Sequence, residues 1–393
     1  MFDVATHLRK LIASEPKIRF YLSEAAIDKD ARMIFAADAI SEFAEPVLVG
    51  NIDAIRKNAL QSPLLGKFAD AKGVTPWEYV DSILSKAIID DPSLPENRDY
   101  LNALADFCYA KLSPKWGGTR ESYLEWLKNP VSYSVAATVP INGLQRKGHC
   151  VLGGLATTSR DFFLPCLRLH PREGTVFTAA LFSFNKDRDP LVYRDGLMVL
   201  ADVAVVSEMN AERLADITFG ASKLAADLLT PEPFDVVNVG MLSYSTSGSG
   251  SGASVLMIRD AYEKVVSRLS EQPQLSSRIR ITPELQFAPA VLEGAARQKL
   301  DMSSPRNAAA GRCNVLIAPN LEVGNVLFHL HVAYFRSCSY VLLPGGFTYN
   351  SAVDFSRSSK VEDIVIAAAA STARIQKLDS AQDVADTLAR RFK

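Results

Sequence analysis

The sequence has few cysteines, no long apolar run and almost no net charge, and each shortage excludes a class of protein. Its five cysteines are odd in number and form no C-x-x-C pair, which favours reduced thiols over a disulfide framework. No apolar run approaches the roughly 20 residues that a membrane-spanning helix needs, and the first ten residues lack the apolar core of a secretory signal. A net charge of −1 gives no basic surface for nucleic acid or an anionic membrane. We therefore expect a cytoplasmic protein in which any anion site is local.

The length and the order of elements predict two α/β domains. A chain of 393 residues is long for a single hydrophobic core. A β-rich run at 18–22, a helical pattern at 28–43 and a second β-rich run at 46–50 follow each other, and this β-α-β order predicts a parallel sheet flanked by helices. Further strands are expected at 175–184, 196–206, 235–245, 314–319 and 339–347, and an amphipathic helix capped by Asn210 is expected at 210–229.

A glycine- and serine-rich segment occupies residues 243–254. Its composition is that of a flexible linker, but it lies between a predicted buried strand and a predicted helix, where α/β proteins bind ligands. Glycines at such a place let backbone N–H groups turn toward a phosphate. Because the segment lacks the G-x-x-x-x-G-K-[ST] pattern of a P-loop, its composition alone leaves linker and ligand loop as alternatives.

Near the carboxyl end, the segment V-D-F-S-R-S-S-K-V-E-D-I-V places a hydroxyl, a guanidinium and a carboxylate at the start of a predicted helix. Ser359 and Glu362 have the S-x-x-E spacing of a capping box. Ser356 and Arg357 would then lie in the loop before the helix, with Asp363 in its first turn. Backbone N–H groups, the helix dipole and the arginine together favour an anion such as phosphate. The alternative is an ordinary capped helix with incidental charges.

Five motifs occur in order between residues 200 and 365. They read L-A-D-V-A-V-V-S-E-M-N-A-E-R-L-A-D-I (200–217), V-G-M-L-S-Y-S-T-S-G-S (239–249), P-E-L-Q-F (283–287), N-V-L-I-A-P-N-L-E-V-G-N (314–325) and the segment V-D-F-S-R-S-S-K-V-E-D-I-V (353–365). Each resembles a motif of the phosphate acetyltransferase (phosphotransacetylase) and phosphate butyryltransferase family; the first matches F-A-D-x-A-V-N-P-x-P-T-A-x-x-L-A-D-I without a gap, and the last resembles N-D-L-S-R-G-x-x-x-E-D-I-V. The chain is identified as a divergent member of this family, whose phosphate acetyltransferases move acetyl groups between coenzyme A and inorganic phosphate.

The resemblance implies a fold and a set of partners. The fold is α/β: a two-domain α/β/α sandwich with parallel-rich sheets and an interdomain cleft, like that of isocitrate and isopropylmalate dehydrogenases. Domain I would comprise residues 1–174 plus 344–393, because the carboxyl-terminal segment returns to it, and domain II residues 175–343. The family also implies a homodimer, no bound cofactor and no metal in the chemical step. Coenzyme A or acetyl-CoA would be the cosubstrate of phosphate and acetyl phosphate.

The resemblance also assigns roles to site residues. Asp363 would be the general base for the coenzyme A thiol, because a thiol with a pKa of about 8.5 is mostly protonated at neutral pH. Arg357 would bind the phosphate and Ser356 would donate a hydrogen bond to the developing oxyanion. Substrate binding is expected of eight further residues: Ser243, Ser245, Thr246, Gly248, Ser249, Asn325, Thr158 and Arg160.

The chain lacks several charged residues of the family. Leu164 stands near the arginine of the family's T-T-A-x-x-x-R-P, so Arg160 or Arg168 would have to replace it. No arginine aligns with the family's R-K-x-K-G-x-T, where Lys111 or Lys115 would be weak replacements. The remaining departures are Ser247 for a lysine, Ala288 and Asn320 for aspartates, and His329 and Ala333 for basic residues.

These departures leave three hypotheses. Losing two arginine–phosphate pairs without replacement would slow the reaction by orders of magnitude. The first hypothesis is acetyl transfer between coenzyme A and phosphate, and the second is transfer of butyryl or another short acyl group. The third is a non-catalytic homologue that senses acyl-CoA. An assay of acetyl phosphate and coenzyme A separates the enzyme from the sensor.

Overall fold

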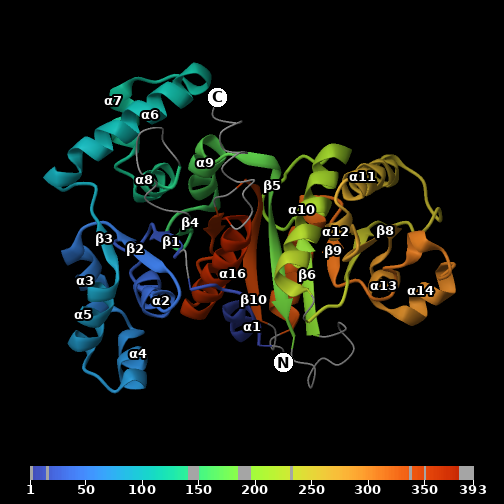
Figure 1. Cartoon of the computed structure of the whole chain (residues 1–393), viewed down its shortest axis with the longest axis horizontal. Helices are drawn as coiled ribbons and strands as arrows, with labels where there is room; N and C mark the ends of the chain where they lie inside the picture. Colours follow the sequence, from blue (N-terminus) through green and yellow to red (C-terminus); the bar gives the residue numbers. More distant parts are fainter. Residues whose placement is uncertain are drawn as a thin grey trace. The chain divides into compact units, whose positions relative to one another are not determined.

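The computed structural model describes residues 3–14, 17–139, 150–184, 196–230, 233–335, 339–348 and 351–379. The chain divides into two compact units, coloured by sequence in Figure 1. We call residues 8–171 plus 348–393 the terminal unit and residues 1–7 plus 172–347 the central unit. The domain limits expected from the sequence stay a prediction, because compactness does not show that a unit folds by itself.

The terminal unit contains a five-stranded sheet of order β11-β4-β1-β2-β3, in which all neighbours are parallel. Leu22 lies beside Leu48 on one side and Leu152 on the other, and Asp354 pairs with Gly153. The carboxyl ends of all five strands therefore meet at one edge, which we call the carboxyl edge of the terminal unit. The strands are β1 (Arg19–Leu22), β2 (Glu45–Val49), β3 (Ile88–Asp90), β4 (Cys150–Gly153) and β11 (Ser351–Asp354).

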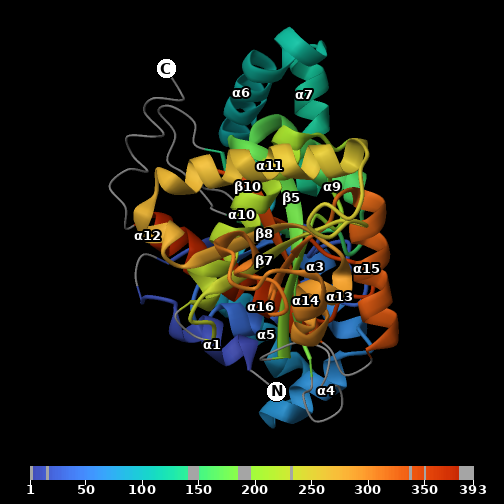
Figure 2. The same cartoon turned by 90° about the vertical axis from the view of Figure 1, so that its right-hand side faces the viewer.

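Helices pack on this sheet and on each other. Helix α2 contacts β2 and α16, α8 contacts β4, and α9 contacts β11. Helices α6 and α7 pack together and project from the sheet of their unit, as Figures 1 and 2 show. The helices are α2 (Arg32–Ile40), α3 (Ile52–Gln61), α4 (Leu65–Lys72), α5 (Pro76–Lys86), η1 (Pro95–Asn97), α6 (Arg98–Trp116), α7 (Arg120–Trp126), α8 (Pro130–Ala137), α9 (Ser159–Leu169) and α16 (Val361–Asp379); α1 (Val4–Lys10) begins in the central unit.

The central unit contains a six-stranded sheet of order β10-β5-β6-β9-β7-β8. Strand β5 is antiparallel to β10 and β6, whereas β6, β9, β7 and β8 are parallel. These four strands end at one edge, the carboxyl edge of the central unit. The strands are β5 (Arg172–Ser183), β6 (Leu197–Ala201), β7 (Val237–Leu242), β8 (Ile279–Leu285), β9 (Val315–Ile317) and β10 (Ser339–Phe347).

Helices cover both faces of the central sheet. On one face α10 crosses β10, β5, β6, β9 and β7, and a Cβ at Gly220 would lie 2.6 Å from the ring of Phe177. On the other face Phe182 and Leu200 share a core with Phe328 of α15, as expected when side chains alternate along a strand. The helices are α10 (Ala211–Leu229), α11 (Ala253–Ser270), α12 (Pro273–Ser276), α13 (Phe287–Val291), α14 (Glu293–Lys299), η3 (Pro305–Asn307) and α15 (Leu321–Tyr334), with α11 seen beside α10 in Figure 2.

Two parallel-rich sheets flanked by helices confirm the α/β fold class. The cap expected at Asn210 is also confirmed, since its side chain accepts a hydrogen bond from the Arg213 N–H at 2.9 Å. The strand expected at 196–206 is too long, because the carboxylate of Asp202 accepts hydrogen bonds from the N–H groups of residues 204–206 and turns the chain. Among the described residues, no helix combines the length and apolar character needed to cross a membrane.

Candidate functional site

The structure brings five of the predicted site residues to the carboxyl edge of the terminal unit. Two follow β4 and three follow β11, and these strands are neighbours. Ligands of open α/β sheets bind at such an edge. The five residues are Thr158, Arg160, Ser356, Arg357 and Asp363. Their roles stay a prediction, but their placement is what a shared site requires.

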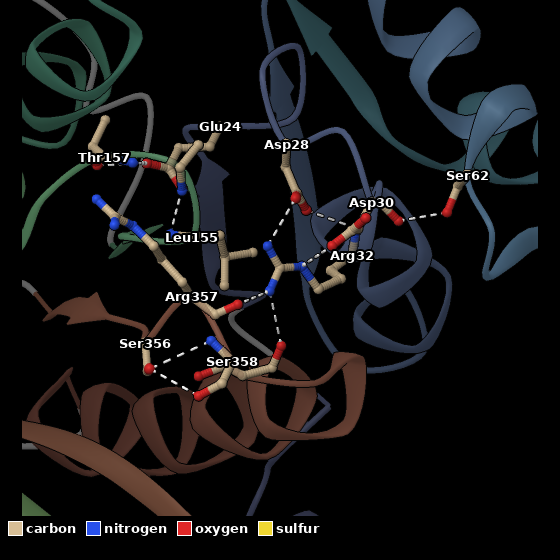
Figure 3. Close-up of polar contacts among 12 residues, drawn as sticks. Glu24, Asp28, Asp30, Arg32, Ser62, Leu155, Thr157, Ser356, Arg357 and Ser358 are labelled. Carbon is tan, nitrogen blue, oxygen red and sulfur yellow. Dashed lines mark hydrogen bonds and ion pairs between the residues drawn. The ribbon is translucent and has the colours of Figure 1, made fainter.

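A buried glutamate organises the loop after β4. The carboxylate of Glu24 accepts hydrogen bonds from the N–H groups of Leu155, Ala156 and Thr157 at 2.7, 3.0 and 2.9 Å, and from the Thr157 hydroxyl at 2.5 Å. Figure 3 shows this cluster. Successive N–H groups of this kind form an anion site, so the loop uses one of the protein's own carboxylates as its anion. The next residue, Thr158, caps α9 by accepting from the Asp161 N–H at 3.2 Å.

A buried arginine fixes the loop after β11. The Nη1 of Arg32 donates to the backbone oxygens of Arg357 and Ser359 at 2.6 and 3.1 Å, and its Nη2 donates to Asp28 at 3.0 Å. Figure 3 shows the guanidinium between these groups. Asp28 also accepts a hydrogen bond from the Arg32 N–H at 2.8 Å, which secures the pair at the start of α2. The backbone at Arg357 is therefore held in place by the loop after β1.

The side chain of Arg357 is exposed and points from its loop toward the loop that carries Leu155 and Thr157, as Figure 3 shows. Within the described parts of the chain, its guanidinium has no ion pair or hydrogen bond. An arginine fork without a protein partner is suited to bind a phosphate in two hydrogen bonds. Nearby, the Ser356 hydroxyl is exposed and lies 3.0 Å from that of Ser358.

The predicted capping box of Ser359 and Glu362 is wrong. Helix α16 begins at Val361, one residue later than that box requires, and Asp363 is its third residue. The carboxylate of Asp363 accepts a hydrogen bond from the Lys360 N–H at 2.8 Å, which is the contact the box assigned to Glu362. The helix starts later because Ser359 is buried with its carbonyl bound to Arg32.

The environment of Asp363 makes it a stronger base than an ordinary aspartate. Burial raises the pKa of its carboxyl group, and neighbouring Glu362 raises it further, while the N–H and the charge of Lys360 oppose the shift without cancelling it. Among the described residues, no hydrogen bond reaches its Oδ1. One oxygen therefore holds the side chain in place, and the other is available to take a proton.

A second carboxylate, that of the partly buried Asp354, ends β11. Burial raises its pKa to about 6 against a hydrogen bond from Ser159, and the charge of Glu24 raises it further. Within the described ranges, its buried Oδ1 has no hydrogen-bond partner. A Cβ at Gly154 would lie 2.0 Å from that oxygen, and Gly154 has φ +89°, so glycine is required there.

The residues that could replace the family's missing arginines lie at different places in the terminal unit. Arg160 is exposed in the first turn of α9, next to the carboxyl edge. Arg168 lies in the last turn, about 12 Å further along the helix axis, and stacks on Trp116 with its Cζ 4.5 Å from the ring centroid. Lys115 also lies over Trp116, whereas Lys111 lies over Phe107. Only Arg160 of these four is placed beside Thr158.

The remaining predicted site residues lie in the central unit, at its own carboxyl edge. The loop after β7 carries five of them, and two of these, Ser245 and Thr246, are buried. Asn325 is exposed on α15 and donates to the Val203 oxygen at 3.3 Å. The full set is Ser243, Ser245, Thr246, Gly248, Ser249 and Asn325, and their substrate-binding role stays a prediction.

The expectation that this loop turns its N–H groups toward a phosphate is wrong for residues 245–250. Each of these six N–H groups donates to an acceptor inside the unit. Gly248, for example, donates to the carboxylate of Glu284 at 2.7 Å. Any substrate contact of residues 245–250 in the same conformation therefore has to come from side chains or carbonyl oxygens.

Glu24, Arg32 and Glu284 were not among the residues singled out from the sequence. Arg32 carries a signal in retrospect, because it stands in the helical run A-R-M-I-F-A-A-D-A-I, where nearly every position is apolar; a charged residue on a buried face is unusual unless it is paired. In the described part of the chain, no group of three or more His, Cys, Asp or Glu side chains is placed to hold a metal ion.

Comparison of the sequence with known proteins identifies the family. The family model described as phosphate acetyl/butaryl transferase matches residues 22–373. The phosphate acetyltransferase of Acetivibrio thermocellus is 27% identical over 352 residues, which cover 88% of this chain and 92% of that protein. The phosphate acetyltransferase of Clostridium acetobutylicum is 27% identical over 373 residues, covering 93% and 96% of the two chains.

Solved structures show the same fold. A phosphotransacetylase from Streptococcus pyogenes superposes with a TM-score of 0.71 at 21% identity, covering 95% of this chain and 98% of the other. A branched-chain phosphotransacylase from Enterococcus faecalis gives a TM-score of 0.54 at 13% identity, covering 91% and 99%. At these identities the likeness establishes the fold alone, and the match over residues 22–373 establishes the family. This chain belongs to the phosphate acetyl/butaryl transferase family.

Proposed function

We propose that this chain transfers an acetyl group between coenzyme A and inorganic phosphate, interconverting acetyl-CoA plus phosphate with acetyl phosphate plus coenzyme A. One observation carries the proposal. The loop after β11 presents Arg357 with a guanidinium that has no partner in the described structure, six residues before a carboxylate, Asp363, with a raised pKa. An anion ligand in this loop and a base in the first turn of the helix that follows it are the groups that a reaction between a phosphorylated acid and a thiol needs.

In the direction of acetyl-CoA, the thiol of coenzyme A gives its proton to Asp363, and the sulfur attacks the carbonyl carbon of acetyl phosphate. The new C–S bond forms and the C–O bond to phosphate breaks, so inorganic phosphate leaves. The proton remains on Asp363 until solvent takes it. In the other direction phosphate attacks the thioester and Asp363 returns the proton to sulfur. A base is needed because a thiol is mostly protonated at neutral pH.

Arg357 binds the phosphate group and neutralises the charge that grows on it as it leaves. Its backbone is fixed by Arg32, so only the side chain has to be ordered when the substrate binds. Ser356 donates its hydroxyl hydrogen to the oxygen that becomes negative in the tetrahedral intermediate. Among the described residues, that exposed hydroxyl contacts Ser358.

Substrate binding is proposed for the other residues of the two carboxyl edges. In the terminal unit these are Thr158 and Arg160, of which Arg160 supplies a charge for a second anionic group. In the central unit they are Ser243, Ser245, Thr246, Gly248, Ser249 and Asn325, acting through side chains and carbonyl oxygens. Coenzyme A or acetyl-CoA is proposed as a cosubstrate and not as a resident cofactor.

Two alternatives have support. The family name covers butyryl as well as acetyl transfer, so a short-chain acyl group other than acetyl is the first. The second is an acyl-CoA sensor without turnover, favoured by Leu164 and Ser247 at positions where the family carries basic residues. Against a sensor, a protein that only binds acyl-CoA has no reason to keep Ser356, Arg357 and Asp363 together at these positions.

Purified protein incubated with coenzyme A and either acetyl phosphate or butyryl phosphate distinguishes these functions by the growth of thioester absorbance. We expect turnover with acetyl phosphate to exceed turnover with butyryl phosphate. The reverse order would establish the short-chain alternative. Binding of acetyl-CoA without turnover from either acyl phosphate would establish the sensor.

A homodimer in the cytoplasm completes the proposal. Helix α15 supports the dimer by exposing Val326, Leu330 and Tyr334 at 63%, 48% and 79%, which line one face at helical spacing. The cytoplasm is supported by Cys108, Cys166 and Cys313, which form no disulfide in the described part of the chain. Sedimentation should give a dimer for the natural chain and a monomer for Leu330→Glu. A monomeric natural chain would contradict this part.

A further inference from the structure

The loop after β7 closes around one carboxylate of its own unit. Glu284 lies near the end of β8 and is only 4% exposed. Its Oε1 accepts hydrogen bonds from the Ser245 hydroxyl at 2.6 Å and the Gly248 N–H at 2.7 Å. The Ser247 N–H donates to the backbone oxygen of Glu284 at 3.2 Å. Side chain and backbone of Glu284 thus bind three successive parts of the loop.

A single arginine neutralises this carboxylate. Arg259 lies on α11, and its Nε and Nη2 donate to the two oxygens of Glu284 at 2.6 and 2.9 Å. A pair joined by two hydrogen bonds fixes the orientation of the carboxylate and also neutralises its charge. Burial alone raises the pKa of Glu284, but the hydrogen bonds from Arg259, Ser245 and Gly248 outweigh it and bring the pKa down to about 2. The carboxylate is therefore charged at any physiological pH.

The backbone conformation of Glu284 indicates that its contacts constrain it strongly. Its φ is +55°, in the left-handed region that residues other than glycine rarely adopt. Such a conformation persists when surrounding contacts determine it. Here the contacts come from the loop, since Ser247 and Gly248 both donate to Glu284.

The other contacts of the loop are among its own residues, where four N–H groups donate to oxygens of Ser243, Ser245, Thr246 and Ser249, and with Leu285 and Gln286. Ser245 joins its ends by accepting the Gly250 N–H at 2.7 Å, and its own hydroxyl hydrogen goes to Glu284. The family's motif has a lysine where this chain has the exposed Ser247. The cation that pairs with Glu284 is therefore Arg259 of helix α11 and not a residue of the loop.

We infer that Glu284 and Arg259 are positioning residues that lock the loop of residues 243–249 into one shape for substrate binding. The inference rests on the proposed function, because it assigns the loop a substrate. Neither residue contacts the substrate itself: Glu284 lies beneath the loop, and both guanidinium nitrogens named above are directed at it. The lock presents the exposed Ser249 and the half-exposed Ser243 in a fixed arrangement.

Two measurements on the full chain test this inference, and the first does not depend on activity. Hydrogen–deuterium exchange of the peptide spanning 243–252 is compared between the natural chain and Arg259→Met. We expect exchange at least about ten-fold faster in the variant, because a buried charge loses its partner. Arg297→Met is the matched control, since Arg297 forms an exposed pair with Glu293 in the same unit, and it should leave that peptide unchanged.

The second measurement is the KM for the acyl substrate against kcat. Arg259→Met should raise KM about ten-fold and change kcat by less than three-fold, and Arg259→Lys should recover part of the KM because it keeps the charge but loses the fork. Arg259→Lys also serves as the test variant if Arg259→Met does not fold. A merely structural role would lower stability in both variants without this division between KM and kcat.

Each outcome decides a separate claim. Unchanged exchange in the loop would overturn the lock, whatever the activity. Faster exchange with an unchanged KM would overturn the positioning role. If the natural chain transfers no acyl group, the proposed function fails, and exchange in the loop still decides whether Glu284 and Arg259 form the lock.

Discussion

The Nη1 of Arg32 donates a 2.6 Å hydrogen bond to the backbone oxygen of Arg357, although 325 positions of sequence separate the two residues. The same nitrogen reaches the oxygen of Ser359, and Asp28 holds the guanidinium from the other side. Arg32, the first residue of α2, thus fixes the backbone of Arg357, the residue proposed to bind phosphate. In this family member, the position of the Arg357 backbone is determined by a tertiary contact and not by its own loop alone.

Replacing Arg32 by Met should therefore weaken phosphate binding without removing Arg357. We expect the KM for phosphate to rise about ten-fold, and the free energy of unfolding to fall by roughly 2–4 kcal/mol because Asp28 loses its buried partner. Arg32→Met combined with Asp28→Asn should recover part of the stability and none of the KM. Kinetics and urea denaturation measure the two effects.

The control for this prediction is Arg19→Met. Arg19 pairs with Glu45 at 2.8 Å near the opposite end of β1, with both side chains about a third exposed (33% and 39%). The variant Arg19→Met tests the effect of losing an arginine–glutamate ion pair from the same sheet. A phosphate KM raised equally in Arg19→Met, or unchanged in Arg32→Met, would contradict the positioning of Arg357 by Arg32.

Asp354 should make the terminal unit less stable as pH rises. Its pKa in the folded chain is about 6, against about 3.9 for an ordinary aspartate. Between these values the folded chain keeps a proton that the unfolded chain has lost, so the free energy of unfolding declines from about pH 4 to about pH 6 and is then level. We expect Asp354→Asn to gain about 1–2 kcal/mol at pH 7 and nothing below pH 4.

Denaturation at pH 4 and pH 7 checks this prediction. Asp301→Asn is a suitable control, because hydrogen bonds from Ser303 lower the pKa of the Asp301 carboxyl and its substitution should bring no gain at pH 7. A gain from Asp354→Asn that is the same at both pH values would show that packing, and not the buried charge, limits stability at this site.

Glu24→Gln should loosen the loop after β4. The amide of glutamine can accept hydrogen bonds through one atom only, so at least one of the N–H groups of Leu155, Ala156 and Thr157 would face an NH₂ group. We expect the free energy of unfolding to fall by about 2–3 kcal/mol. Glu96→Gln, at an exposed position of η1 in the same unit, is the control. A stability equal to that of the natural chain would show that the loop does not depend on its internal carboxylate.

Local patterns in the sequence were sufficient for the elements and for some of their ends. Apolar runs indicated β1 and β7, and Asn210 marked the start of α10, because each signal depends on residues close in sequence. The start of α16 was displaced by one residue because Ser359 has the right chemistry for a cap, and only its contact with Arg32 shows that it lies outside the helix.

The internal carboxylates of the two carboxyl edges could not be predicted in the same way. Glu24 binds N–H groups 131 to 133 positions away, and Glu284 binds Ser245 39 positions away. A glutamate after a strand and a glycine-rich loop elsewhere give no sign that they meet. The glycine-rich segment of residues 243–254 follows a strand, as its sequence context indicates, but its composition does not show that two of its N–H groups bond to Glu284 and four to oxygens of the segment itself.

The pH dependence of acyl transfer in the natural chain and in Asp363→Asn tests the central claim most directly. Asp363 must lose its proton to act as a base, and its pKa lies above the ordinary value, so kcat should fall with decreasing pH at a higher pH than for an ordinary aspartate. At pH values where Asp363 is deprotonated, Asp363→Asn should lower kcat by about 10²–10⁴ while acetyl-CoA still binds, and the difference should shrink at lower pH. Turnover by Asp363→Asn equal to that of the natural chain would contradict the account.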